Sequence, residues 1–162
     1  MRTLVVYESM FGNTEAVARE VAAGLAGQGE VVLVDVDAAP TDVTSYDLVV
    51  VGGPTHAFSM SRATTRADAV KQGAPHARVR GIREWIDGLG RVPVPMAVFD
   101  TRVEKVRRLP GSAAKRAAKS LKAHGSPIAE RPQSFYVQDT PGPLLDGERE
   151  RARRWGASLV GA

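Results

Sequence analysis

The residues with the clearest chemical potential lie between Ser9 and Thr14, in the stretch Ser-Met-Phe-Gly-Asn-Thr. Ser9 and Thr14 offer hydroxyl groups, Gly12 allows close approach of the backbone, and successive amides point toward the start of a predicted helix. Such neutral donors at a helix N-terminus bind anions. The stretch lacks both the glycine spacing of a dinucleotide loop and the lysine of a triphosphate loop. It therefore predicts a site for a terminal monophosphate.

Two later segments place polar and aromatic side chains directly after apolar runs. Residues 52–60 follow the run at 48–51, and residues 99–102 follow the run at 94–99. We interpret both segments as loops whose side chains could contact the same ligand as the first loop. The candidate residues in them are Pro54, Thr55, His56, Ala57, Phe58, Phe99, Asp100, Thr101 and Arg102.

The elements that must position these loops alternate along the chain. Apolar runs predict strands at 3–7, 31–34, 48–51, 94–99 and 134–137, and helical spacing predicts helices near 14–26, 65–72, 82–89, 112–123 and 146–159. This alternation indicates a doubly wound α/β domain over residues 1–162, with helices on both faces of a five-stranded parallel sheet in the order 2-1-3-4-5. Ligands bind such sheets beyond the carboxyl ends of the strands, so we expect the three loops to converge.

Composition narrows the chemistry. The chain has no cysteine, which excludes disulfides, thiolate-held clusters and thiol catalysis. The three histidines, His56, His76 and His124, are isolated, and we expect no metal. No signal peptide or apolar run of membrane length is recognisable, so we expect a cytoplasmic protein without a membrane span.

Charge is distributed unevenly along the chain. Residues 1–61 carry 8 acids against 2 bases, whereas residues 62–122 carry 15 bases against 5 acids. The bases are dispersed, with few aromatic residues among them to stack on nucleobases, so we expect no nucleic-acid binding. A basic surface that faces an acidic partner protein is the favoured interpretation.

The stretch Ser9-Met10-Phe11-Gly12-Asn13-Thr14 resembles the phosphate loop of the flavodoxin family, whose usual pattern is [S/T]-x-T-G-N-T. The resemblance implies a flavodoxin-like three-layer sandwich that binds FMN without a covalent bond and exchanges electrons with redox partner proteins. It also implies that this loop and the two later segments contact FMN. Phe11 departs from the family pattern by replacing a hydroxyl group with an aromatic ring.

The later segments depart further from the family. His56 stands where many flavodoxins have a stacking tryptophan, and Ala57 stands where they commonly have a glycine. The usual G-x-G-D-x-x-Y pattern is missing around residues 99–102. There, Asp100 could accept a hydrogen bond from the flavin N3–H, Thr101 could serve O2 or O4, and Arg102 could approach the pyrimidine edge.

Three functions remain open from the sequence. The first is an FMN-dependent electron carrier, expected to be a monomer, in which no side chain acts as a catalyst. The second is a flavin-dependent reductase of the quinone or protoporphyrinogen type, in which residues 61–81 would cover the flavin and bind a substrate. The third is a binding module with the same fold and no cofactor.

Overall fold

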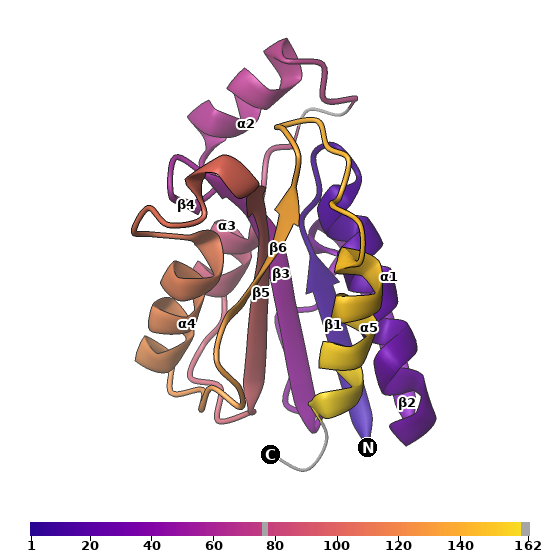
Figure 1. The fold of residues 1–162 in the computed structure, drawn as a ribbon. Helices are drawn as coiled ribbons and strands as arrows, with labels where there is room; N and C mark the ends of the chain where they lie inside the picture. Colours follow the sequence, from indigo (N-terminus) through magenta and orange to yellow (C-terminus); the bar gives the residue numbers. More distant parts are fainter. Residues whose placement is uncertain (76–77, 160–162) are drawn as a thin grey trace.

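The computed structural model describes residues 1–75 and 78–159, which form an α/β sandwich (Figure 1). Short 3-10 turns at residues 26–28, 36–38 and 104–106 join some of the elements. The helices and strands, in chain order, are β1 (Arg2–Tyr7), α1 (Asn13–Leu25), β2 (Glu30–Asp35), β3 (Leu48–His56), β4 (Ser59–Met60), α2 (Ala63–Lys71), α3 (Ile82–Asp87), β5 (Met96–Val103), α4 (Ala113–Ala123), β6 (Gln133–Val137) and α5 (Glu148–Ser158).

The main sheet has the strand order β2-β1-β3-β5-β6, and all these neighbours pair in parallel. Counted without the short β4, this is the predicted order 2-1-3-4-5, and the predicted fold class is confirmed. The sequence analysis did not predict β4, which pairs antiparallel with the end of β3. A two-residue turn at Ala57 and Phe58 joins these two strands.

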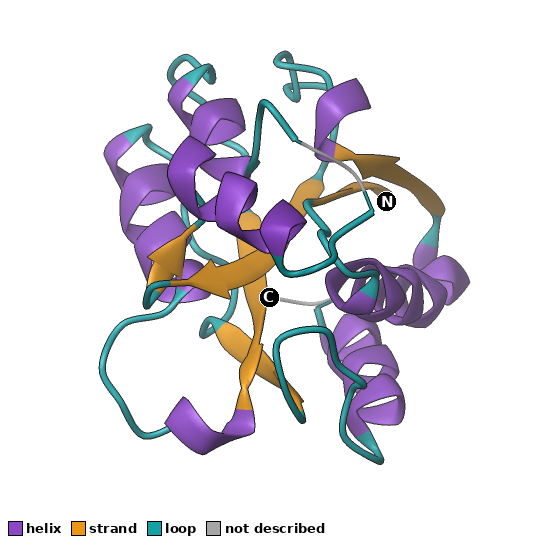
Figure 2. Cartoon of the chain, turned by 90° about the horizontal axis from the view of Figure 1, so that it is seen from above, coloured by secondary structure: helices purple, strands orange, loops and turns teal. Residues whose placement is uncertain are grey.

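Helices cover both faces of the sheet, as the view from above shows (Figure 2). On one face, Val17, Val21 and Leu25 of α1 pack with Trp155 of α5 in one core cluster. On the other face, α3 and α4 bury a second cluster that includes Trp85 and Leu121. The helical spacing recognised in the sequence thus corresponds to the buried faces of these helices.

The predicted ends of two strands are wrong. β3 continues to His56 and β5 to Val103, so all of residues 52–56 and 99–102 are strand rather than loop. The pairing of β3 with β5 continues through Gly52 and Phe99. Gly52 is required there because a Cβ atom at this position would overlap the ring of Phe99.

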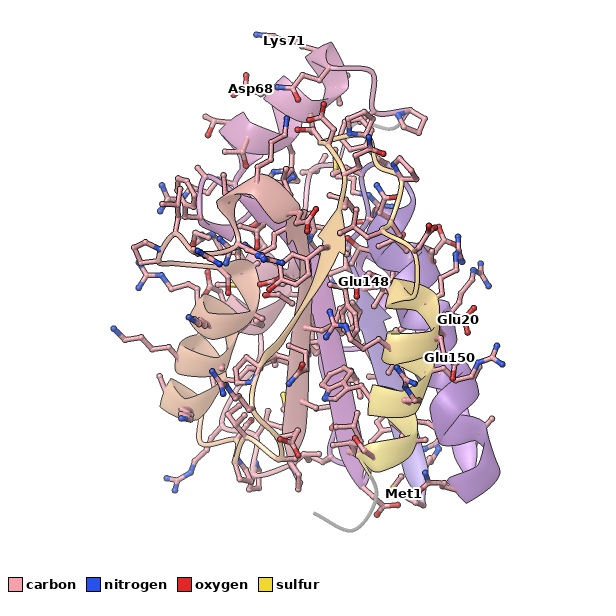
Figure 3. All side chains as sticks on the ribbon, in the orientation of Figure 1. Met1, Glu20, Asp68, Lys71, Glu148 and Glu150 are labelled. Carbon is pink, nitrogen blue, oxygen red and sulfur yellow. The ribbon has the colours of Figure 1, made fainter. Side chains whose placement is uncertain are left out.

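The helix α2 lies above the carboxyl edge of the sheet, apart from the two helical layers (Figure 1). Asp68 and Lys71 extend from its outer surface (Figure 3). The chain then returns toward the sheet through residues 72–75 and 78–81. None of the described helices is long and apolar enough to cross a membrane.

Candidate functional site

A cleft opens at the carboxyl ends of β1, β3, β5 and β6, where the topology predicts a ligand site. It brings together parts of all three predicted segments. Its interior space is about 70 Å³, which is enough for a phosphate-sized group, since one water needs roughly 10–15 Å³. The lining residues are Met10, Phe11, Asn13, Thr14, Pro54, Thr55, His56, Thr101, Arg102, Val103, Val137 and Thr140.

The loop before α1 forms one wall of this cleft. Gly12 has φ of 92° and precedes the first residue of α1, and its amide donates a hydrogen bond to Ser9 Oγ over 3.1 Å. No atom lies within 4 Å of a Cβ built at Gly12, so the left-handed backbone conformation alone favours glycine. Ser9 accepts this bond and keeps its own O–H group available to donate.

Two buried hydroxyl groups connect this loop with β5. Thr14 Oγ1 and Thr101 Oγ1 are 2.7 Å apart, and both residues line the cleft. The first turn of α1 adds backbone N–H groups that have no partner within the helix. This set of hydroxyls and amides could donate hydrogen bonds to a phosphoryl group.

The Phe11 side chain has a structural role in addition to its place in the cleft wall. It packs against a small buried cluster of Met10, Ala69 and Ala74. Ala69 belongs to α2 and Ala74 to the segment after it. The aromatic ring therefore joins the phosphate loop to α2, which a hydroxyl side chain at this position would not do.

His56 lies at the end of β3 and lines the cleft. Its Nδ1 lies 3.1 Å from Thr65 Oγ1 of α2. Burial, and secondarily the charge of Arg66, lower the pKa of the imidazole below its usual value. The ring is therefore neutral at neutral pH and presents a flat surface beside the cleft.

Ala57 and Phe58 form the turn after His56 and do not line the cleft. Their φ angles are 48° and 60°, in the left-handed region that residues with a Cβ rarely adopt. Phe58 is 46% exposed. The turn thus combines backbone strain with an exposed aromatic ring at the edge of the site.

Of the four predicted site residues in β5, two lie away from the cleft and two line it. Phe99 is fully buried and packs edge-to-face against Phe135 and Trp155. Asp100 is also fully buried, and its Oδ2 accepts a hydrogen bond from the Ala114 amide over 2.9 Å. Neither residue reaches the cleft. Burial raises the pKa of Asp100, while the hydrogen bond from the Ala114 amide opposes this rise.

Thr101 and Arg102, in contrast, do line the cleft. Arg102 is 5% exposed, and its Nη2 donates hydrogen bonds to the carbonyl groups of Val106 over 2.7 Å and Leu109 over 3.3 Å. Among the described residues, no group accepts a hydrogen bond from its Nε. A buried positive charge with a free donor therefore lies beside the cleft.

Arg78 is a basic residue beside the phosphate loop that the sequence analysis missed. Its Nε donates to the Ser9 carbonyl over 2.9 Å, and its other nitrogens contact Asp35 over 2.7 Å and Asp37 over 3.1 Å. Burial opposes ionisation of Asp35, but the hydrogen bonds from Arg78 and from the Asp37 amide, together with the charge of Arg78, lower the pKa of this carboxyl group. No local pattern could reveal a contact between residues 69 positions apart.

A buried polar network holds α2 against the end of β1. Glu8 is fully buried and accepts hydrogen bonds from the Ser61 hydroxyl over 2.5 Å and the Ile82 amide over 2.9 Å. Arg66 of α2 donates to Ser61 over 2.9 Å and pairs with Glu84. Burial raises the pKa of Glu8 above its usual value. Because these groups are mutually satisfied, the network fixes the segment above the cleft.

The segment between β6 and α5 closes another side of the cleft. Val137 and Thr140 line the cleft, as does Val103 of β5, and the sequence analysis predicted none of the three. A Cβ atom at Gly142 would overlap the Asn13 side chain, so the two segments lie in close contact. The predicted helix near residue 146 begins at Glu148, which makes this connecting segment longer than expected.

The described residues contain no group of three or more His, Cys, Asp or Glu side chains that could hold a metal ion. His56 and His124 lie far apart in the chain and make separate contacts. His76 lies outside the described residues.

Comparisons with known proteins agree with this architecture. The family model described as Flavodoxin matches residues 5–74, which include the phosphate loop and the start of the segment above the cleft. No curated protein matches the chain.

Several solved flavodoxin structures are similar over nearly the whole chain. Flavodoxin 2 from Bacillus cereus is 18% identical with a TM-score of 0.71, covering 98% of this chain and 97% of its own. A flavodoxin from the domain Archaea is 16% identical with a TM-score of 0.67, covering 98% and 96%. The flavodoxin of Streptococcus pneumonia TIGR4 is 14% identical with a TM-score of 0.67, covering 98% and 97%. These similarities show that the chain has a flavodoxin-like fold, and the family model agrees with the resemblance drawn from the phosphate-loop motif.

Proposed function

We propose that the protein binds FMN without a covalent bond in the cleft and carries electrons between redox partner proteins. The observation that carries this proposal is the meeting of Thr14 and Thr101 at the N-terminus of α1 in the wall of the cleft, next to the loop in which Ser9 accepts a hydrogen bond from the Gly12 amide. These groups offer neutral donors to a terminal phosphate. When bound, FMN supplies the capacity to accept and release electrons.

The other cleft residues would hold the rest of the cofactor. The interior space fits a phosphoryl group, so the ring would lie at the mouth of the cleft, near Thr55, Pro54 and His56. The neutral imidazole of His56 suits contact with an apolar ring. The Arg102 charge beside the cleft favours electron-rich forms of a bound group. Phe99 and Asp100 would support the site through the core rather than by contact.

The carrier function needs no acid or base in the protein, because the cofactor does the redox chemistry. The groups around the cleft would instead orient the cofactor and enclose it. Glu8, with its raised pKa, is buried in a network with Ser61 and Ile82 and does not line the cleft. We expect the protein to act in the cytoplasm as a monomer.

A reductase function is favoured by one observation. A second cavity of about 290 Å³ lies between β3 and α2 and shares Thr55, His56 and Thr140 with the cleft. Such a cavity could hold a small substrate beside a bound flavin. Steady-state oxidation of NAD(P)H with a quinone as acceptor distinguishes the two functions. Rapid turnover by the isolated protein indicates a reductase, and no turnover indicates a carrier.

The test of the proposal is binding of FMN to the purified protein. The visible spectrum and the release of FMN on denaturation report the cofactor that is retained, and a fluorescence titration reports its affinity. We expect Thr14→Val to weaken FMN binding about tenfold or more, since a hydrogen bond to a charged group contributes about 1.5–3 kcal/mol.

Thr41→Val is the matched control, because Thr41 is exposed and remote from the cleft. It should leave the FMN affinity unchanged. A colourless wild-type protein that fails to bind added FMN would refute the proposal.

A further inference from the structure

Another concave surface, in addition to the cleft and to the cavity between β3 and α2, lies between the β3–β4 turn and α4. It has a volume of about 400 Å³. We call it the basic groove, and it is lined by Ala57, Phe58, Ser59, Arg62, Gly111, Ser112, Lys115, Arg116 and Lys119. Neither the family resemblance nor the phosphate loop accounts for this surface.

The charge of the groove is strongly one-sided. Residues 104–122, which include the groove residues of α4 and of the segment before it, contain seven bases and a single acid, Glu104. Glu104 pairs with Arg107, outside the groove, over 3.5 Å. No described residue forms a salt bridge with Arg62, Lys115, Arg116 or Lys119, all of which are exposed. The positive charge of the groove is therefore available to a partner.

The cations also crowd one another. Arg83 contacts the groove through Ser59, because its guanidinium donates to the Ser59 hydroxyl as well as to the carbonyls of Ser61 and Met60. Burial first, and then the charge of Arg62, lower its pKa; Glu84 opposes this shift, and Arg116 adds to it. Like charges held this close repel each other, and a negatively charged partner would relieve that repulsion.

The groove and the cleft share a boundary. His56 lines the cleft, and the next two residues, Ala57 and Phe58, line the groove. On the other side, Arg102 and Val103 line the cleft, and residues 104–110 lead from them to Gly111 and Ser112 in the groove. A protein bound in the groove would therefore cover the edge of the cleft.

We propose that the basic groove is the docking surface for an electron-transfer protein with a carboxylate-rich face around its own redox centre. The inference rests on the proposed function, because docking there brings a second redox centre to the cleft. Each transfer takes one electron from the reduced centre of one protein and adds it to the oxidised centre of the other, with no bond formed between them. Phe58, 46% exposed at the rim, provides an apolar contact within the charged surface.

Nucleic acid fits the groove less well. Single strands bind where several aromatic side chains stack on successive bases, and Phe58 is the only aromatic residue that lines the groove within residues 1–75 and 78–159. The helix α5 on the opposite face is also basic, but there Arg151 pairs with Glu148 and Arg153 pairs with Glu20, so part of its positive charge is balanced.

The test measures association with an acidic [2Fe–2S] ferredoxin as the probe, immobilised for biolayer interferometry, with basic cytochrome c as the opposite probe. The variant Lys115→Glu/Lys119→Glu reverses two exposed charges of the groove. The matched control, Arg149→Glu/Arg154→Glu, makes the same change of net charge on α5. Rates are compared at about 0.01 M and about 0.15 M salt, between which the screening length falls from about 30 Å to about 8 Å.

We expect the groove variant to lower the association rate with ferredoxin about tenfold or more at low salt, because electrostatic steering raises such rates by 10–10³. The difference should shrink at higher salt, and the control should stay close to the wild type. The inference is overturned by any of four results: no association of the wild type with ferredoxin, equal effects of the two variants, preference for cytochrome c, or tighter binding of a short DNA through the same lysines.

A separate FMN titration of every protein keeps the two proposals distinguishable. Association is measured without cofactor, so a protein that docks ferredoxin through the groove but binds no FMN contradicts only the proposed function. A protein that binds FMN but docks nothing through the groove contradicts only the inference.

Discussion

The turn between β3 and β4 stores conformational strain that a single substitution should release. Ala57 and Phe58 have φ angles of 48° and 60°, as in the type I′ turns that usually contain Asn-Gly. In this region of backbone conformation, a residue with a Cβ atom is less stable than glycine by roughly 1–2 kcal/mol. Replacement of Ala57 by glycine also adds freedom to the unfolded chain, which costs about 0.4–1 kcal/mol. The net expectation for Ala57→Gly is a gain of about 1 kcal/mol in the free energy of unfolding.

Urea denaturation of the cofactor-free protein measures this gain, and thermal unfolding should show a rise of about 2–4 °C. The matched control is Ala23→Gly, which removes the same atoms from an exposed position inside α1. There glycine should cost about 1 kcal/mol. Equal losses for the two variants would refute the strained turn. The backbone of Phe58 lies against Gly111, where a Cβ atom would be 2.8 Å from the Phe58 carbonyl oxygen, so the surrounding structure maintains the strain.

Three further predictions follow from the site. Arg78→Met should weaken FMN binding, as measured by titration, because it releases the Ser9 carbonyl. In the wild type, the lowered pKa of Asp35 predicts that the free energy of unfolding decreases as pH falls below 3.8, the usual pKa of this carboxyl group. Arg78→Met should remove this decrease. The lowered pKa of His56 predicts that the wild type has its full free energy of unfolding above pH 6.5 and loses part of it as pH falls. His56→Asn should therefore make the free energy of unfolding less dependent on pH below 6.5. An unchanged slope in pH-dependent urea denaturation would contradict this. Gly52→Ala should lower the free energy of unfolding by about 1–3 kcal/mol, because the new Cβ atom meets the ring of Phe99.

Sequence periodicity identified the main strands and the buried faces of the helices, because both depend on local spacing, and the rules for connections in α/β sheets then gave the strand order. It failed at the ends of β3 and β5. Gly52, Gly53 and Pro54 are turn-forming residues by type, yet the register of the two strands continues through them. The neighbouring strand, which local sequence does not specify, decided their conformation.

The same distinction between local sequence and tertiary packing explains which site residues could be predicted. The residues of the phosphate loop were found because their chemistry and spacing lie within one short stretch. Thr140 lines the cleft, and Arg78 donates to the Ser9 carbonyl. Both are brought there by connecting segments whose path depends on tertiary packing. Asp100 has the right chemistry for a ligand contact, but it lies on the side of β5 that faces α4, which the predicted loop could not reveal.

The arrangement of charge separates cofactor binding from partner recognition. Arg78, the basic side chain that contacts the phosphate loop, is matched by Asp35 and Asp37, so a phosphate would depend on hydroxyls, amides and the α1 dipole. The cations of the basic groove have no such partners among the described residues. They are exposed, and salt screens exposed charges over about 8 Å at physiological strength. Reversal of Lys115 and Lys119 should therefore change docking while FMN affinity stays constant.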